Sequence, residues 1–207
     1  MPVIVVANPK GGVGKSTLAT SVAGALAAAG HAVMLGDVDR QQSSRQWLAL
    51  RPPAARPIAG WDVDAGDIVR PPKGTSHVVL DTPAGLHGKR LDAVMKIADQ
   101  LLVPLQPSLF DIQATHAFVQ ELRAHRRGHE VKIGLVGMRV REHTRAVEQL
   151  QAWLATLPVP VVGWLRDTQN YVQLAAHGLT LFDVAQSRVE RDLEQWRPLR
   201  AWLGIAA

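Results

Sequence analysis

The segment at residues 8–17, which reads N-P-K-G-G-V-G-K-S-T, constrains this chain more than any other. An apolar run at residues 3–7 precedes it, and an alanine-rich stretch at residues 18–29 follows it. Strand, glycine-rich loop and helix in this order are typical of a phosphate-binding loop, because glycines let successive backbone N–H groups point at phosphate oxygens. The N-terminus of the following helix adds the positive end of its dipole.

The side chains of the loop suit a nucleotide and its metal. Lys15 can reach the β- and γ-phosphates, and the Ser16 hydroxyl can bind Mg²⁺. The usual pattern, G-x-x-x-x-G-K-[ST], requires glycine where Pro9 stands, and this chain carries an additional lysine, Lys10. The residues that we predict to contact the nucleotide through this loop are Lys10, Gly11, Gly12, Val13, Gly14, Lys15, Ser16 and Thr17.

Carboxylates follow two further apolar strands. Asp37 and Asp39 come after the run at residues 31–35, and Asp81 ends the V-V-L-D sequence of a Walker B pattern. A single aspartate at a strand end is more often a helix cap or a surface group. Here the carboxyl ends of parallel strands meet at one edge of the sheet, so the acids should lie near the loop, where Asp81 can hold Mg²⁺.

Strands alternate with helices along the chain, which predicts a doubly wound, mostly parallel α/β sheet flanked by helices. Its length of 207 residues suits a single domain spanning residues 1–207. The expected strands are 3–7, 31–35, 61–63, 77–80, 100–104, 131–136 and 159–164, with a turn at 71–74. The expected helices after the one that follows the loop are 43–50, 90–97, 111–127, 144–157, 169–177 and 183–203.

The K-G-G-x-G-K-[ST] loop with its extra Lys10 resembles the deviant phosphate loop of the ParA/MinD family of ATPases. In that family the second acidic segment reads D-x-D-P-Q, and this chain has D-V-D-R-Q at residues 37–41, with Arg40 in place of proline. The resemblance implies a P-loop NTPase fold. It also implies that Asp39 orients the attacking water, that Asp37 supports the metal, and that residues 81–85 form the switch that senses the γ-phosphate.

Later segments extend the resemblance to about residue 184. Residues 103–111 are similar to a P-x-x-P-S-x-x-D stretch of plasmid ParA proteins, although such a segment can also be simply a stiff loop. Residues 137–141 correspond to the end of the strand beside the nucleobase, so that Met138 and Arg139 become candidate base contacts. Residues 166–179 resemble the loop and helix that close the adenine side.

The resemblance implies slow, Mg²⁺-dependent ATP hydrolysis by a chain that dimerises on ATP. Lys10 would reach across a two-fold axis to the phosphates of the partner subunit, so the implied catalytic residues are Lys10, Lys15 and Asp39. The implied metal-binding residues are Ser16, Asp37 and Asp81. The family also implies a stimulatory, ParB-like partner protein and a cytoplasmic, nucleoid-associated location.

Two kinds of ligand are open for the ATP dimer. Arginines gather late in the chain, and the net charge of +5 favours an anionic partner such as nonspecific DNA. These late arginines are Arg139, Arg141, Arg145, Arg166, Arg188, Arg191, Arg197 and Arg200. An alternative is a MinD-like ATPase that positions a membrane-bound or polar protein complex.

The C-terminal segment bears on that alternative. Trp196, Leu199, Trp202 and Leu203 share one helical face, as in a helix that lies on lipid. The same face continues back through Val189 and Leu193, which favours a final helix packed on the sheet, and membrane binding is therefore the weaker expectation. A transferase or reductase subunit of the wider group ranks last, because the chain has no cysteine for a metal cluster. Plasmids, chromosomes and protein complexes all stay open as cargo.

Overall fold

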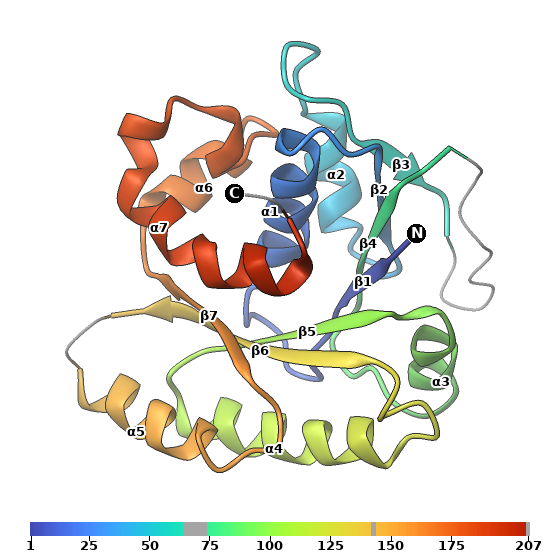
Figure 1. Ribbon diagram of the computed structural model, residues 1–207, viewed down its shortest axis with the longest axis vertical. Coiled ribbons are helices and arrows are strands. Elements are labelled where there is room, and N and C mark those ends of the chain that lie inside the picture. The colour runs from blue at the N-terminus through green and yellow to red at the C-terminus, as the bar shows by residue number, and fades with distance from the viewer. Residues whose placement is uncertain (64–73, 142–143, 206–207) are drawn as a thin grey trace.

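The computed structural model describes residues 1–63, 74–141 and 144–205, and a parallel sheet lies at its centre (Figure 1). Seven strands of the described chain pair in the order β3-β2-β4-β1-β5-β6-β7, and every pairing is parallel. The strands are β1 (Val3–Val6), β2 (Val33–Asp37), β3 (Ala59–Trp61), β4 (His77–Asp81), β5 (Gln100–Leu105), β6 (Lys132–Val140) and β7 (Val161–Arg166).

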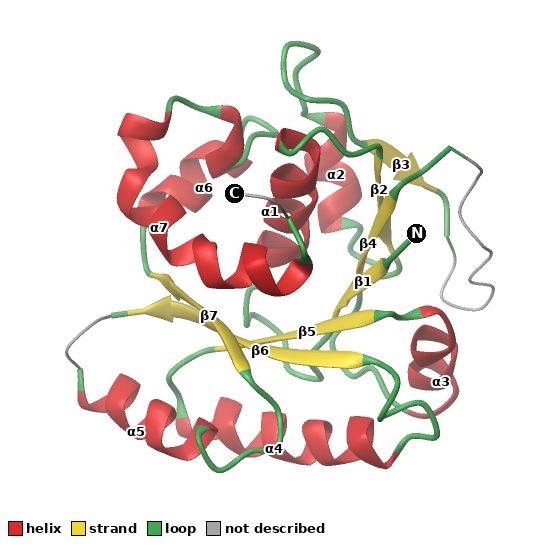
Figure 2. Cartoon of the chain, in the orientation of Figure 1, coloured by secondary structure: helices red, strands yellow, loops and turns green. Residues whose placement is uncertain are grey.

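Helices cover both faces of this sheet (Figure 2). They are α1 (Lys15–Ala28), α2 (Ser43–Ala49), α3 (Gly88–Ile97), α4 (Leu109–Ala124), α5 (Arg145–Leu154), α6 (Gln169–Ala175) and α7 (Gln186–Leu203), with a 3₁₀ turn η1 (Leu181–Asp183). One hydrophobic core joins the sheet to α1, α2 and α7, and the other joins it to α3, α4 and α5. The predicted doubly wound α/β fold is confirmed.

The central strand explains why a continuous apolar run occurs here. In β1, Ile4 and Val6 enter one core while Val3 and Val5 enter the other, so no position of the strand faces water. The register of β4 places Asp81 opposite Val6 on one side and opposite Asp37 on the other. The two acidic strand ends therefore meet beside the point where the chain leaves β1 for the loop.

The structure moves several predicted boundaries. Strand β6 extends to Val140 rather than ending at 136, with an irregular register beyond Gly137, and so carries Met138 and Arg139 to the sheet edge. Strand β3 lies at Ala59–Trp61, slightly before the expected 61–63. Helix α4 begins at Leu109, because the Ser108 hydroxyl accepts from the Asp111 N–H, and it ends at Ala124, before the extended His125. Of the expected turn at 71–74, residues 71–73 lie outside the described chain.

The C-terminal helix is interrupted where the sequence predicts a continuous one. A capping box between Thr180 and Asp183 begins the separate turn η1, and α7 begins only at Gln186. Within α7, Val189 has non-helical backbone angles. The predicted apolar face is nevertheless confirmed as a packing face, since Trp196, Leu199 and Leu203 are buried against the sheet and α1.

Candidate functional site

The loop between β1 and α1 is held in a conformation that glycine makes possible. Gly12 and Gly14 have φ of 77° and 96°, in the left-handed region that side chains disfavour. A Cβ at Gly14 would also lie 3.0 Å from the Cε atom of Met138, on β6. The loop can therefore curl closely over the start of α1, where N–H groups converge on an anion site.

Lys15 lies inside this loop. Its Nζ donates to the backbone oxygen of Lys10 at 2.7 Å, and the residue is buried. Burial lowers the pKa of Lys15, while the negative charges of Asp81 and Asp39 act in the opposite direction. The structure thus brings Lys15 within electrostatic reach of two of the predicted acids, Asp81 and Asp39.

Asp81 is the acid best suited to a metal. Its Oδ2 accepts from the Ser44 hydroxyl at 2.7 Å, whereas its buried Oδ1 has no hydrogen-bond partner in the part of the chain that the structure describes. Burial raises the pKa of Asp81 to about 6, against the opposing effects of the Ser16 and Ser44 hydroxyls. An orphaned carboxylate oxygen near a serine hydroxyl is the hard oxygen donor set that Mg²⁺ prefers, so the residues present fit this ion.

Asp37 has a different environment. Its Oδ1 accepts from the Asp39 N–H at 3.0 Å, and its Oδ2 accepts from the N–H groups of Ser44 at 2.8 Å and Arg45 at 3.3 Å. Burial raises its pKa, while these backbone donors lower it. Both oxygens of Asp37 therefore bind the backbone of the loop that leads into α2. The contacts thus favour a metal site formed by Ser16 and Asp81, without Asp37 as a direct ligand.

Asp39 lies half-exposed at the centre of that same loop. Its Oδ1 accepts from the Gln41 N–H at 3.0 Å. The side-chain amide of Gln42 donates to the backbone oxygens of Asp37 at 2.8 Å and Asp39 at 2.7 Å. Gln42 thus connects two backbone positions of the loop, while Arg40, which stands where the family pattern has proline, is exposed.

The additional lysine of the loop has a partner that sequence reasoning missed. The Nζ of Lys10 lies 2.5 Å from Oδ1 of Asp111, and the two side chains are 37% and 7% exposed. Asp111 ends the P-x-x-P-S-x-x-D stretch, but the two residues are 101 positions apart, so only that motif could have pointed to it. The same stretch also contacts the loop through Gln106, whose side-chain amide donates to the backbone oxygen of Gly12 at 2.8 Å.

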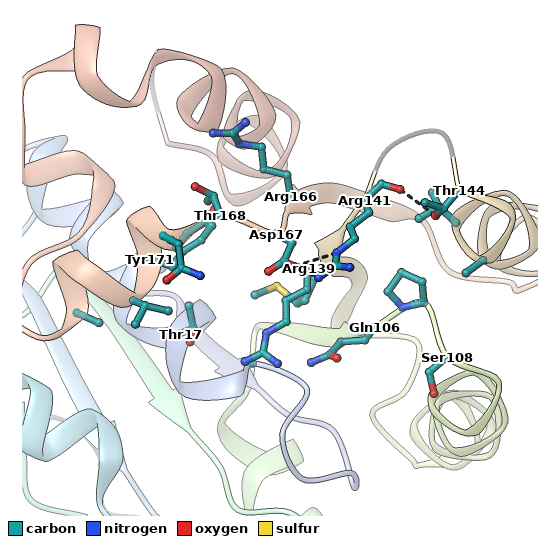
Figure 3. Close-up of a pocket in the computed structure, with 18 residues that line it drawn as sticks. Thr17, Gln106, Ser108, Arg139, Arg141, Thr144, Arg166, Asp167, Thr168 and Tyr171 are labelled. Carbon is teal, nitrogen blue, oxygen red and sulfur yellow. Dashed lines mark hydrogen bonds and ion pairs between the residues drawn. The ribbon is translucent and has the colours of Figure 1, made fainter.

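A hollow of about 860 Å³ opens beside the loop (Figure 3). The structure brings the predicted base-side residues together here: Met138 and Arg139 from β6 face Gly14 and Thr17 of the loop and α1, and Thr168 and Tyr171 form the opposite wall. Arg139 has φ of 51°, and its side chain extends between Thr17 and Gln106. An ion pair of 2.9 Å between Arg141 and Asp167 lies at the end of β6 and β7.

All of the late arginines except Arg145, which begins α5, form two groups in space. Arg139, Arg141 and Arg166 line the hollow, and Arg166 is also paired with the buried Asp192. The other group lies on α7, on the opposite face of the sheet from α5, and its Arg188 and Arg197 are exposed. In the described residues, no helix has the length and apolarity needed to cross a membrane.

The sequence is similar to those of known proteins. Residues 4–181 match the family described as the CobQ/CobB/MinD/ParA nucleotide binding domain. The chain is 41% identical over 116 residues to maintenance of carboxysome distribution protein A of Gloeobacter kilaueensis, covering 53% of this chain and 51% of that protein. The matched region thus spans about half the length of that relative. Protein ParA of Rhizobium radiobacter is 30% identical over 152 residues, or 69% of this chain and 68% of the relative.

The fold has solved counterparts as well. MinD in the MinC:MinD cell division protein complex of Aquifex aeolicus superimposes with a TM-score of 0.76 at 17% identity, covering 100% of this chain and 97% of the other. At that identity the likeness concerns the fold, whereas the family match spans most of the sequence. The chain belongs to the CobQ/CobB/MinD/ParA family of nucleotide-binding domains and is an ATPase of the ParA/MinD type.

Proposed function

We propose that residues 1–207 form one ATPase domain that dimerises on ATP and uses slow, Mg²⁺-dependent hydrolysis to separate again. The observation that carries this proposal is Lys10, a cation at the mouth of the phosphate loop with 37% of its side chain exposed. Lys15 already serves the loop from inside, so a second lysine is not required to hold phosphates within one chain. A cation at the mouth can instead serve the phosphates of a second copy.

Each group in the site has a role in this proposal. The loop amides and Lys15 hold the triphosphate, and Ser16 and Asp81 hold Mg²⁺, with Asp37 supporting the loop around them. When bound, Mg²⁺ neutralises negative charge that develops on the phosphate oxygens. Asp39 orients the water that attacks the γ-phosphate, and hydrogen bonds from the Gln41 N–H and the side-chain amide of Gln42 keep it in place.

Met138 and Arg139 are the proposed contacts to the nucleobase side of ATP. Met138 packs against Gly14, and Arg139 extends between Thr17 and Gln106 in the hollow. The apolar side chain of Met138 suits the face of a base, and the guanidinium of Arg139 suits ribose or phosphate oxygens. A fluorescent ATP analogue that binds Met138→Ala as tightly as the parent protein would remove Met138 from the base site.

Sedimentation with ATP tests the dimer directly. We expect Lys10→Ala to stay monomeric with ATP while the parent protein dimerises. Lys132→Ala is a matched control, because Lys132 is also exposed but begins β6 at the edge of the sheet remote from the loop. A normal ATP-dependent dimer of Lys10→Ala would overturn the role of this lysine.

Nonspecific DNA is the proposed ligand of the dimer, with the exposed Arg188 and Arg197 of α7 as phosphate contacts. Partition or positioning of plasmid or chromosomal DNA, in a nucleoid-associated cytoplasmic protein, is the function that follows. Exchanging both arginines for alanine should reduce the slope of log affinity against log salt by about 2, since each phosphate contact contributes about 0.9. Arg126→Ala, on an exposed arginine beyond α4, is the control.

A second candidate function is the positioning of a protein complex. One relative is named for carboxysome distribution and one structural counterpart is a MinD bound to MinC. Co-pelleting with anionic vesicles distinguishes a membrane-based mechanism: ATP-dependent binding to vesicles without binding to duplex DNA would favour the MinD-like alternative. The burial of the apolar face of α7 argues against that helix as a lipid anchor.

Stimulation by a partner protein is the remaining part of the proposal. A ParB-like protein with an arginine-bearing flexible segment would accelerate phosphate release from the dimer, because a supplied cation stabilises the charge that develops during phosphoryl transfer. Phosphate release measured with and without the product of a neighbouring gene tests this step. An unchanged rate with each such protein, on DNA and in its absence, would contradict it.

A further inference from the structure

Phe110 is the most exposed large hydrophobic residue of the described chain, at 71%, compared with 63% for Val172 and 57% for Leu50. It is the second residue of α4, a helix whose Phe118 and Leu122 are buried in the core below it. Phe110 is therefore not needed to attach the helix to the sheet. An aromatic ring held in water at this position suggests a contact with another molecule.

The surroundings of Phe110 connect it to the phosphate loop. The Nζ of Lys10 lies 5.6 Å from the centre of its ring, and the next residue, Asp111, holds that same lysine. The ring thus lies beside the one loop cation that is directed outward. Any molecule that takes Lys10 into contact with its own phosphates also approaches Phe110.

Small residues form the neighbouring surface. Gly11, Gly12, Ala84 and Gly85 are all exposed, and the loops that carry them are joined by a hydrogen bond of 2.7 Å from the Gly85 N–H to the Pro9 oxygen. A Cβ at Gly11 would lie 4.0 Å from the Cβ of Ala84, so the two segments are in contact. Small residues permit close approach of another backbone, and Phe110 adds an exposed, large apolar group beside Lys10, the residue that precedes Gly11.

We infer that Phe110 is an anchor of the surface that contacts the second copy of this chain in the ATP dimer. This inference rests on the proposed function. A two-fold dimer brings the same patch of both copies together, so that Lys10 of each copy meets the negative phosphates of the other while the apolar rings are removed from water. Duplex DNA would complement Lys10 but offers the ring no apolar surface while its bases stay stacked, which favours a second copy as the occupant.

Sedimentation of the full chain with a non-hydrolysable ATP analogue tests the inference. We expect Phe110→Ala to raise the dimer dissociation constant about tenfold, since a few buried aromatic side chains carry much of the binding energy of an interface. Phe110→Leu should stay within about threefold of the parent, because leucine keeps most of the apolar surface but not the ring's contact with the cation. Leu50→Ala, which removes an exposed apolar side chain from the end of α2, is the matched control and should dimerise normally.

Two further binding measurements, together with the outcomes of the sedimentation, separate this inference from the proposed function. A fluorescent ATP analogue should bind Phe110→Ala monomers as tightly as the parent. If it binds more weakly, the ring acts through the nucleotide site and the inference is overturned. A parent protein that stays monomeric with the analogue overturns the proposed dimer and the inference together, whereas an unchanged or tighter dimer of Phe110→Ala overturns the inference alone. Loss of DNA binding by a Phe110→Ala protein that still dimerises would assign the ring to DNA and also overturn it.

Discussion

The two ends of the phosphate loop carry the same charged group in opposite environments. At the inner end, Lys15 is buried, donates to a backbone oxygen of its own loop, and faces the buried Asp81. At the outer end, Lys10 is more than a third exposed and pairs with Asp111 of α4, beside the exposed ring of Phe110. One lysine is surrounded by its own chain, and the other lies at the surface.

This difference indicates that the two ends of the loop have different functions. Charges interact strongly where water is excluded and weakly where it is not, so the inner groups suit chemistry on a bound nucleotide. An ion pair with an exposed member contributes little to stability and can be exchanged for another partner. The outer end therefore suits a contact that forms and breaks, and the four predictions below test this division from the largest expected effect to the smallest.

The largest effect should come from the inner lysine. Lys15→Ala removes the buried cation that faces Asp81 and Asp39, and we expect ATP hydrolysis to fall about 10³-fold, as for the loss of a main charge-stabilising group. Release of inorganic phosphate measures this, and Lys132→Ala serves as the control. Near-normal phosphate release from Lys15→Ala would show that the inner end does not carry the chemistry.

The second prediction concerns the acid of the inner end. Asp81→Asn should largely abolish Mg²⁺-dependent hydrolysis and yet stabilise the nucleotide-free protein, because a buried charge without a full set of partners is costly. Since burial raises the pKa from 3.8 to about 6, the gain at pH 7 is at most roughly 3 kcal/mol. Thermal unfolding in the presence of a chelator measures it.

The pH dependence of that gain has a definite sign. The folded protein holds a proton on Asp81 up to about pH 6, whereas the unfolded chain releases it near 3.8, so the cost of burying this charge is present at pH 7 and declines as the pH falls through 6. The difference in Tm between Asp81→Asn and the parent should therefore shrink between pH 7 and pH 5. A difference that grows over this range would contradict the raised pKa.

A smaller effect is expected at the outer end. Asp111→Asn removes the charge that holds Lys10 within its own chain, so the lysine becomes easier to transfer to a second copy. We expect the ATP-dependent dimer to become about threefold tighter, in keeping with the modest strength of a partly exposed pair. Sedimentation with ATP measures it, and a weaker dimer would mean that Asp111 supports the dimer contact instead.

The smallest effect should come from the loop between the strand β2 and helix α2. Arg40→Pro restores the residue of the family pattern, but the amide of Gln42 already joins the backbone oxygens of Asp37 and Asp39. We expect the rate of ATP hydrolysis to change by less than about twofold, because proline then adds only local stiffness. Gln42→Ala, which removes both hydrogen bonds, should reduce the rate more, and the opposite order would make Arg40 the important residue.

Much of the architecture could be read from local patterns. The alternation of apolar strands and amphipathic helices, together with the loop at residues 8–17, predicted the doubly wound sheet and the position of its binding edge. The predicted boundaries were less accurate where tertiary contacts determine them. Strand β6, for example, continues through Arg139, whose left-handed backbone conformation could not be predicted from the sequence. The buried face of α7 followed from periodicity, but the separate 3₁₀ turn before Gln186, which a capping box begins, was not predicted.

The chain's own order of residues was enough to identify a nucleotide site, because a glycine loop between a strand and a helix is a local arrangement with a direct chemical meaning. Its partners could not be found in this way. Ser44 on Asp81, Gln106 on Gly12 and Asp111 on Lys10 come from elements far apart in sequence, and only the packing of α2, β5 and α4 around the sheet edge brings them together. Which lysine is enclosed and which faces outward is likewise a matter of burial, and burial exists only once the chain has folded.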